Sequence, residues 1–310
     1  MKQSTRRMMA KFILSLMVIS AVCEAQETPA DYNEILTILG RKGDFSQGVL
    51  KVGIPRTDLH VTVSGIPVPT SFGFGGWLAF TRGMSEMDVM MGDLVLLEDE
   101  VNPVMSALLN NGFEVTALHN HFFWEHPRIF YMHVHGHGRA ADLAHRVKIA
   151  LDLIGHVTHA QSGSSENETA QTKSPAGKPF AEGKLNSQRL DEIIAHKGEF
   201  LGPVYKVTVG RDDLTLKDMG AVINSRMGLN TWAALYGTDQ NAVIAGDVAM
   251  LDVEVNAVLK ALRENGLEVV AIHHHMTGTN PTIIFLHYWG AGPAEKLATG
   301  FKAALNQLGR

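Results

Sequence analysis

The feature that most restricts the fold of this chain is an internal duplication. Residues 246–292 repeat residues 92–138 at a constant offset of 154, with 21 of 47 positions identical. The match continues upstream at an offset of 155, where KGDF (42–45) corresponds to KGEF (197–200). Self-similarity at a fixed period means that one structural unit is used twice, so we expect two like copies of a single fold.

The chain of 310 residues has the length expected of two domains of about 150 residues each. Between the copies, residues 158–183 are polar and contain almost no large apolar side chain, which is typical of a flexible linker. We therefore predict copy one at 26–157, a linker at 158–185 and copy two at 186–310. Residues 1–25 form a separate segment in this prediction.

This first segment resembles a secretory signal peptide. Four basic residues precede an apolar run, Phe12–Val22, and small residues then surround a cleavage position after Ala25. The run is too short to span a hydrocarbon core of about 30 Å, so we predict an exported, periplasmic or cell-envelope protein without a transmembrane span. Cys23 is the only cysteine and is a candidate for a lipid anchor. The rest of the chain therefore offers a metal only nitrogen and oxygen ligands.

Hydrophobic periodicity predicts the same order of elements in both copies. A short helix comes first (about 31–41 and 187–197), and extended segments follow it. The duplicated part then has the order β-α-β-β-α, which resembles a ferredoxin-like unit and predicts an α+β fold with helices on one face of the sheet. In copy one the predicted ranges are 93–97, 98–110, 113–123, 129–138 and 141–155.

Six of the fifteen histidines lie between residues 117 and 138. Side chains alternate between the two faces of a strand, and five of these histidines have odd numbers, so we expect them on one face. If the hairpin loop is centred on Pro127, His121 lies opposite His133 and His119 opposite His135. Copy two keeps three of the five and has Trp289 and Ala291 in place of the others.

Neutral imidazoles close together are the ligands that Zn²⁺, Cu²⁺ and Ni²⁺ prefer, with zinc the first expectation. Three histidines with one open coordination position are typical of catalytic zinc sites. The alternative is a hydrogen-bonded histidine surface that holds no ligand. The candidate metal ligands are His119, His121, His133, His135 and His137 in copy one and His273, His275 and His287 in copy two.

Acidic residues also repeat near the histidine strands. Glu100 and Glu254 begin the second helix of each copy and are candidate proton carriers in catalysis, although a negative charge in a helix's first turn is favourable by itself. Asp93 and Asp247 repeat ahead of them. Trp77 is expected in the core rather than in a site.

Three classes of function are open. The first is an envelope protein that binds a divalent metal or a small polar ligand through its histidines. The second is a metal-dependent hydrolase, because a metal with an open position lowers the pKa of bound water to about 7. The third is a structural or interaction module. A net charge of −5, with no basic run after the first segment, argues against nucleic acid as a partner.

The stretches GDLVLLEDEVNPV…GFEVTALHNHF…PRIFYMHVHGHG and GDVAMLDVEVNAV…GLEVVAIHHHM…PTIIFLHYWGAG resemble the repeated domain of the LppY/LpqO lipoprotein family. The resemblance covers about 31–155 and 186–309. It implies a secreted or envelope-attached bacterial protein with two copies of a domain of unknown function, and it implies no reaction. The residues before Cys23 depart from the usual lipid-attachment pattern.

Overall fold

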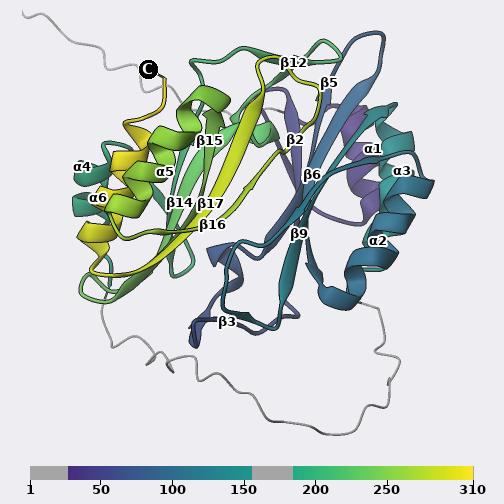
Figure 1. Ribbon diagram of the computed structural model, residues 1–310. Coiled ribbons are helices and arrows are strands. Elements are labelled where there is room, and N and C mark those ends of the chain that lie inside the picture. The colour runs from purple at the N-terminus through teal and green to yellow at the C-terminus, as the bar shows by residue number, and fades with distance from the viewer. Residues whose placement is uncertain (1–26, 156–183, 310) are drawn as a thin grey trace, which may run out of the picture.

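The computed structural model describes residues 27–155 and 184–309, which form two similar α+β units (Figure 1). The predicted signal segment, Cys23 and nearly all of the predicted linker lie outside the described residues. Within the described ranges, none of the helices has the length and apolar character needed to cross a membrane.

Each copy contains one six-stranded antiparallel sheet and three α-helices. The sheet of copy one has the strand order β1-β2-β5-β6-β9-β7, and that of copy two has the equivalent order β10-β11-β14-β15-β17-β16. In copy one the helices are α1 (Ala30–Leu39), α2 (Glu98–Asn110) and α3 (Ala140–Leu151), and the strands are β1 (Gly43–Ser46), β2 (Val49–Pro55), β3 (Val61–Val63), β4 (Ile66–Val68), β5 (Gly75–Arg82), β6 (Asp88–Leu97), β7 (Glu114–His119), β8 (Glu125–His126) and β9 (Ile129–Gly138). In copy two the helices are α4 (Ser187–Ile194), α5 (Val255–Glu264) and α6 (Ala294–Leu305), and the strands are β10 (Glu199–Leu201), β11 (Val204–Gly210), β12 (Leu216–Asp218), β13 (Ala221–Ile223), β14 (Asn230–Gly237), β15 (Ala242–Leu251), β16 (Glu268–His273) and β17 (Ile283–Gly292). Three short 3₁₀ turns complete them: η1 (Thr70–Phe72), η2 (Ser225–Met227) and η3 (Asp252–Glu254).

The predicted duplication and α+β class are confirmed. Helix α2 has the predicted bounds because Val101, Val104 and Leu108 form one buried stripe and Gly112, at φ +75°, ends the helical segment. The ferredoxin-like description is not confirmed, because β6, β7 and β9 belong to a continuous six-stranded sheet that also contains three earlier strands.

The molecule has four layers, with helices outside and two sheets inside (Figure 1). Helices α1, α2 and α3 cover the outer face of one sheet, and α4, α5 and α6 cover the outer face of the other. Each helix layer packs on its sheet through an apolar core, which includes Ile35 and Leu143 in copy one and Leu262 and Phe301 in copy two. The inner faces of the two sheets meet at a surface that we call the seam.

Two short hairpins cross the seam in opposite directions. The β3–β4 hairpin of copy one places Val61 and Val63 in a buried cluster with Val243 of the copy-two sheet. The β12–β13 hairpin of copy two places Leu216 in a buried cluster with Val49 of the copy-one sheet. Each copy therefore covers part of the other's sheet, and the two copies dock closely.

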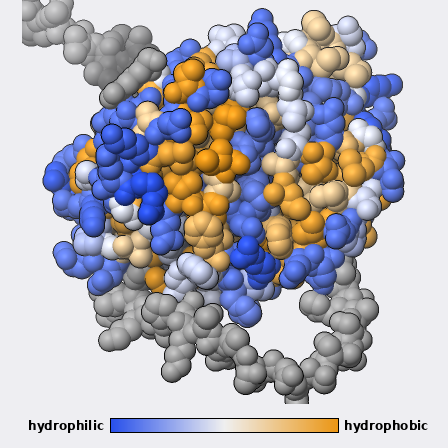
Figure 2. Space-filling model, viewed as in Figure 1, coloured by the Kyte–Doolittle hydropathy of each residue, from blue (hydrophilic) through white to orange (hydrophobic). Residues whose placement is uncertain are grey.

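Polar residues line the seam at the surface on one side of the molecule. Figure 2 shows two groups of apolar residues on this face, one over each copy, with a band of hydrophilic residues between them. Large exposed apolar side chains include the equivalent residues Leu118 and Ile272, which lie on the edge strands β7 and β16. The two edge strands thus carry exposed apolar side chains at equivalent positions.

Candidate metal centre

The sheet register brings functional side chains of each copy into one row. Trp77 pairs with Asp93, and Asp93 pairs in turn with His133, across β5, β6 and β9. Copy two repeats this row as Trp232, Asp247 and His287. Because directly paired residues of an antiparallel sheet point to the same face, each row points toward the seam.

The remaining histidines of the seam lie where β7 and β16 end. His119 and His273 are the last residues of these strands, and His121 and His275 follow two positions later. The predicted hairpin register is wrong: His119 pairs with Tyr131.

The register differs for two physical reasons. Strand β8 leaves the hairpin to pair with β3, which makes the connection longer than a turn centred on Pro127. A bulge between Val115 and Ala117 also interrupts the alternation of β7. As a result, Phe113 and Val115, which the uninterrupted alternation predicts on the histidine face, pack instead with the helix-side core.

Six histidines, three from each copy, meet at the seam around an approximate twofold axis. The rings of the equivalent residues His119 and His273 have centroids 3.8 Å apart. Two further contacts are related by this axis: the centroids of His121 and His287 are 3.7 Å apart, and those of His133 and His275 are 4.0 Å apart. Histidines of both copies therefore line a common seam.

All six seam histidines are buried, and most of their ring nitrogens have no hydrogen-bond partner. Within the described residues, nine such nitrogens are unpartnered, including both nitrogens of His121, His273 and His275. A buried polar atom without a partner costs roughly 1–3 kcal/mol, and native proteins contain few of them. Such a concentration at one place therefore requires a ligand or another specific explanation.

Burial lowers the pKa of every seam histidine, because the charged imidazolium loses its hydration. The pKa values of His119 and His275 fall to about 3, and mutual repulsion with other histidines adds to the effect at His119. The pKa values of His121, His133, His273 and His287 are also lowered well below the ordinary value. All six rings are therefore neutral near pH 7, and neutral imidazole is the form that binds a metal.

The backbone fixes which nitrogen is available on the two β-strand histidines. Nδ1 of His287 lies 3.2 Å from the carbonyl oxygen of Gly246, and the backbone of Gly92 makes the equivalent contact with His133. A carbonyl oxygen only accepts hydrogen bonds, so Nδ1 carries the hydrogen and Nε2 keeps its lone pair. Nε2 of both residues is unpartnered. This arrangement is the one that commonly orients histidine ligands of metals.

Two sets of seam histidines have ligand atoms within 4.8 Å of one another: His119, His273 and His287 form one, and His133, His273 and His275 form the other. The twofold axis relates the second set to His287, His119 and His121. Ring centroids in this related set are 4.9 Å apart for His119 and His287 and 5.3 Å apart for His119 and His121. These histidine clusters could hold a metal ion.

Two aspartates adjoin the histidines. Oδ2 of Asp247 lies 3.3 Å from Nε2 of His275, although the contact does not have the geometry of a hydrogen bond. Burial raises the pKa of Asp247 well above the ordinary value, and it does the same for Asp93, where repulsion by Asp247 adds to the effect. Oδ1 of Asp93 is buried and unpartnered within the described part of the chain.

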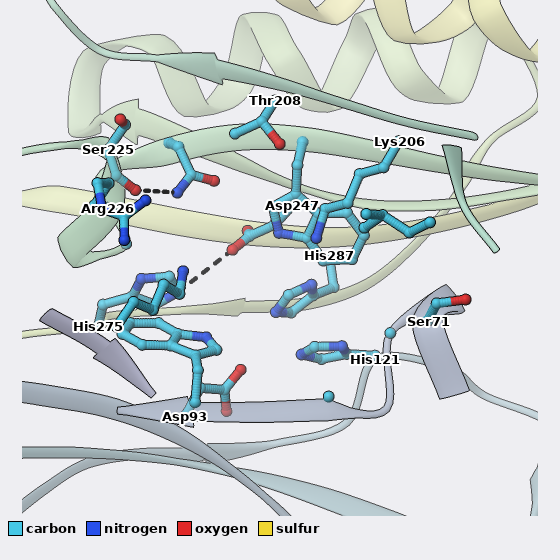
Figure 3. Close-up of a pocket in the computed structure, with 18 of the residues that line it drawn as sticks. Ser71, Asp93, His121, Lys206, Thr208, Ser225, Arg226, Asp247, His275 and His287 are labelled. Atoms are coloured by element: carbon cyan, nitrogen blue, oxygen red, sulfur yellow. Dashed lines mark hydrogen bonds and ion pairs between the residues drawn. The ribbon is translucent and has the colours of Figure 1, made fainter. Parts of the chain in front are cut away.

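A cavity of about 500 Å³ lies over this centre and is lined by both copies (Figure 3). His121 and His287 are stacked against one another and both line it, as do Asp93 of copy one and Asp247 of copy two. Lys51 and Lys206 also line it and lie over the rings of Trp77 and Trp232 respectively, each 4.4 Å from the ring centroid. The cavity thus combines neutral imidazoles, buried carboxyl groups and two ammonium groups.

Sequence reasoning missed both lysines and expected Trp77 in the core. The signal was present, because LKVGIPR (50–56) corresponds to YKVTVGR (205–211) at the offset of 155. This correspondence contains the lysine pair and the arginine pair Arg56 and Arg211. A charged residue in the middle of a predicted strand is a stronger indication of a functional site when both copies retain it than when only one copy has it.

His135 and His137 form a different group, which has no equivalent in copy two because Trp289 and Ala291 occupy the corresponding positions. Nε2 of His135 lies 2.6 Å from Oδ2 of Asp218, and Nε2 of His137 lies 3.0 Å from the same oxygen. Burial alone would lower the pKa of His135, but Asp218 and then Glu114 raise it above the ordinary value. The three residues could also hold a metal, yet they already satisfy one another as an ion-paired contact between the copies.

Glu100 and Glu254 have partners of their own outside the histidine cluster. Glu100 accepts hydrogen bonds from Arg56, at 2.6 Å, and from the backbone of Leu97 and Gly155. Glu254 makes the equivalent contacts with Arg211 and with the backbone of Leu251 and Gly309, which are at 2.8, 2.8 and 2.6 Å. These contacts account for both buried carboxylates as structural groups, and proton transfer by either stays a prediction.

Comparison with known families corrects the resemblance drawn from the sequence. The family model described as Domain of Unknown Function (DUF1259) matches residues 33–153 and 188–307, which is most of the chain. Assignment to the LppY/LpqO family is therefore wrong. No curated protein matches the chain.

Two solved structures align with 84% of this chain and 89% of their own chains. One is the trimeric bacterial microcompartment shell protein PduB, with 14% identity and a TM-score of 0.19. The other is EtuB from Clostridium kluyveri, with 10% identity and a TM-score of 0.19. TM-scores this low support no argument about the fold or the function of this chain.

Proposed function

Since this chain belongs to the family described as Domain of Unknown Function (DUF1259), we propose that its function lies at the seam, where it binds two divalent transition-metal ions. Zn²⁺ is the expected metal, because clusters of neutral imidazoles suit its tetrahedral coordination. Cu²⁺ and Ni²⁺ are the alternatives, because imidazole nitrogen also suits them.

The observation that carries this proposal is the group of nine buried, unpartnered imidazole nitrogens on six neutral histidines. Bound metal ions would give several of these nitrogens a partner. A hydrogen-bonded surface or core would leave few of them unpaired, because unpaired buried polar groups are rare in native proteins. The unpaired nitrogens therefore favour metal binding over a purely structural role for the seam.

We assign the ligands by the approximate symmetry. One site uses His119 and His121 of copy one with His287 of copy two, and the other uses His273 and His275 of copy two with His133 of copy one. Each site thus takes a His-x-His pair from one copy and a β-strand histidine from the other. His135 and His137 are left out of both sites, because Asp218 already pairs with them.

Metal content measured on protein purified without a polyhistidine tag tests the proposal. After removal of metal and dialysis against Zn²⁺, the wild type is expected to retain two equivalents. His274→Ala is the matched control, because His274 is exposed between the two buried histidines of the second site. His273→Ala/His275→Ala should lose one equivalent, and His119→Ala/His121→Ala should lose the other.

A wild-type protein that retains no zinc, copper or nickel and shows no change of melting temperature with any of them would overturn the proposal. That result would favour the structural module instead. A third retained equivalent that disappears in Asp218→Asn would locate one more ion at His135 and His137. Such a third ion would not affect the assignment of the two symmetric sites.

Metal-dependent hydrolysis is the second candidate function. What favours it is the position of Asp93 and Asp247, which line the same cavity as the histidines. Oδ2 of Asp247 lies 3.3 Å from Nε2 of His275. The sequence-based candidates Glu100 and Glu254 instead pair with Arg56 and Arg211. Three protein ligands leave one position for water, and an adjoining carboxylate could accept its proton. Ester, phosphoester and amide substrates should be screened with Zn²⁺ present, and activity retained by Asp93→Asn/Asp247→Asn would reject this mechanism.

Export to the cell envelope remains part of the proposal. It rests on the basic residues and the apolar run of the first segment, which resemble a secretory signal. Cell fractionation with sequencing of the mature N-terminus tests it. A mature chain that starts at Gln26 is expected, whereas a chain that retains its first residues and stays in the cytosol would contradict export.

A further inference from the structure

We propose that the cavity over the histidines binds a small, polar, anionic molecule whose carboxylate or phosphate group lies between Lys51 and Lys206. The proposal deepens the proposed function, because it names the ligand class of the same cavity. Its first step, anion capture by the lysines, does not require a metal. Its second step places the rest of the ligand against the metal sites and therefore rests on the proposed function.

Lys51 and Lys206 are equivalent residues of the two copies, and both line the one cavity. Each ammonium group lies over a tryptophan ring, which orients it and covers one side of it. Within residues 27–155 and 184–309, neither lysine forms an ion pair or a hydrogen bond. Two half-buried ammonium groups thus face a common space. Carboxyl groups of Asp93, Asp247 and Glu199 line the same space and favour the charged lysines from a distance, but none of them pairs directly with either ammonium group.

The lysines are close enough to repel one another. The pKa of Lys51 is lowered to about 8, first by burial and then by the positive charges of Lys206 and Arg226. Burial also lowers the pKa of Lys206. An anion placed between them would relieve this repulsion and replace the water that the half-buried ammonium groups lack, which is the chemistry of an anion site.

Arg226 adds a third cation at the same cavity. Its guanidinium forms an ion pair with Asp44 of copy one at 2.6 Å, while its Nε is buried and unpartnered within the described part of the chain. Arg226 thus adds positive charge beside the two lysines, and this charge contributes to the lowered pKa of Lys51. Because guanidinium and ammonium groups together favour carboxylate and phosphate oxygens, the arrangement selects an oxyanion.

The uncharged part of the lining indicates a polar ligand rather than an apolar one. Hydroxyl and amide side chains contribute from both copies, and glycines leave room beside the histidines. A cavity of about 500 Å³ suits a small molecule. The uncharged polar residues of the lining are Thr70, Ser71, Thr208, Ser225 and Asn230.

Calorimetric titration of metal-free protein tests anion capture apart from metal binding. The probes are inorganic phosphate and malonate, which represent the two oxyanion types. The wild type is expected to bind one equivalent of at least one probe, and the relative affinities show whether phosphate or carboxylate is the preferred group. Absence of saturable binding of both probes up to about 10 mM would overturn the proposal.

Charge removal at the lysines locates the site. Lys51→Met and Lys206→Met should each weaken probe binding about tenfold or more, because each removes one charge-assisted contact. The double variant should bind no probe detectably. Lys260→Met is the matched control, since Lys260 is an exposed lysine of α5. Unchanged affinity in the double variant would overturn the proposal.

Conservative variants and metal content keep the result interpretable. Lys51→Arg/Lys206→Arg retains both charges and should retain probe binding even if the methionine variants fold poorly. The methionine variants should still retain two equivalents of zinc. His119→Ala/His273→Ala removes one ligand from each metal site at positions that do not line the cavity, and it should still bind the probe without metal. A wild-type protein that binds the anion but retains no metal would therefore reject the proposed function and still support the anion site.

Discussion

His121 and His287 belong to different copies, yet their ring centroids lie only 3.7 Å apart at the seam. The related pair, His133 and His275, has the same relationship with the copies exchanged. In the proposed assignment, neither copy alone contains a complete three-histidine site. In this assignment the duplication creates sites that a single copy could not form, because each copy supplies the histidine that the other copy's pair lacks.

This crossed arrangement predicts an unusual pattern of double variants. His121→Ala/His287→Ala removes two ligands of one site and should retain about one zinc equivalent. His121→Ala/His133→Ala removes one ligand from each site and should retain almost none, although both residues belong to copy one. Metal analysis after dialysis distinguishes the two results. Equal loss in both variants would show that the ligands are not divided in this way.

The seam histidines also predict how acid affects the metal-free protein. Their pKa values in the folded state are lowered, to about 3 for His119 and His275, whereas an unfolded histidine has its ordinary value of about 6.5. Protons therefore bind the unfolded chain more readily below pH 6.5. Stability that is present above pH 6.5 is lost as the pH falls below it.

Urea unfolding between pH 7.5 and pH 5 measures this effect. The free energy of unfolding should decrease with falling pH in the wild type and decrease less in His119→Gln/His273→Gln, which removes two of the groups that titrate. His274→Gln, at an exposed position, should follow the wild type. A wild-type stability that is constant between pH 6.5 and 5 would contradict the burial of neutral imidazoles.

The sequence predicted the duplication, the element order and the gathering of histidines, because each depends on local patterns or on comparison of the two copies. Helix α2 was predicted with its observed bounds because its apolar stripe and its Asn111-Gly112 end are local signals. The register of His119 was not predictable in this way. It depends on β8 pairing with a distant strand, and a periodic pattern carries no information about such pairing.

The other half of the site also depends on tertiary contacts. Lys51 and Lys206 lie in strands far from the histidines in sequence and reach them only because the two sheets face each other. Asp218 pairs with His135 because the β12–β13 hairpin crosses to the other copy. Glu100 looked like a candidate proton carrier because the sequence could not reveal that Arg56 contacts it.

The ion pair between Arg56 and Glu100 gives a test of that structural assignment. Both side chains are buried, at 3% and 2% exposed, and removing one partner of a buried pair leaves an unpaired charge that costs about 3–5 kcal/mol. Glu100→Gln should therefore lower the free energy of unfolding by an amount of this order and leave zinc stoichiometry unchanged. Glu98→Gln, at an exposed position of the same helix turn, should have little effect.

Loss of activity in Glu100→Gln would have a different meaning if stability were unchanged. Should a hydrolytic activity be found, a variant that folds with wild-type stability but has lost its turnover would restore Glu100 as a catalytic candidate. A variant that is destabilised while its remaining folded fraction is fully active would support the structural role. Thermal unfolding and turnover measured on the same sample separate the two.

The proposed anion site predicts a dependence on pH at the alkaline side. Lys51 has a pKa of about 8 in the free protein, where burial, Lys206 and Arg226 lower the value and Asp93 raises it. The protonated lysine binds an anion, and the neutral amine does not. Affinity for malonate, whose two carboxyl groups are both ionised above about pH 7, should be highest near pH 7 and should fall as the pH rises through about 8.

Calorimetric titrations of metal-free protein at a series of pH values between 6 and 9.5 measure this fall. Lys51→Arg keeps its charge over the whole range, because guanidinium stays protonated, so the fall should move to higher pH in this variant. Lys260→Met should follow the wild type, since the exposed Lys260 does not line the cavity. An affinity that stays constant up to pH 9.5 in the wild type would show that Lys51 does not carry the charge that holds the anion.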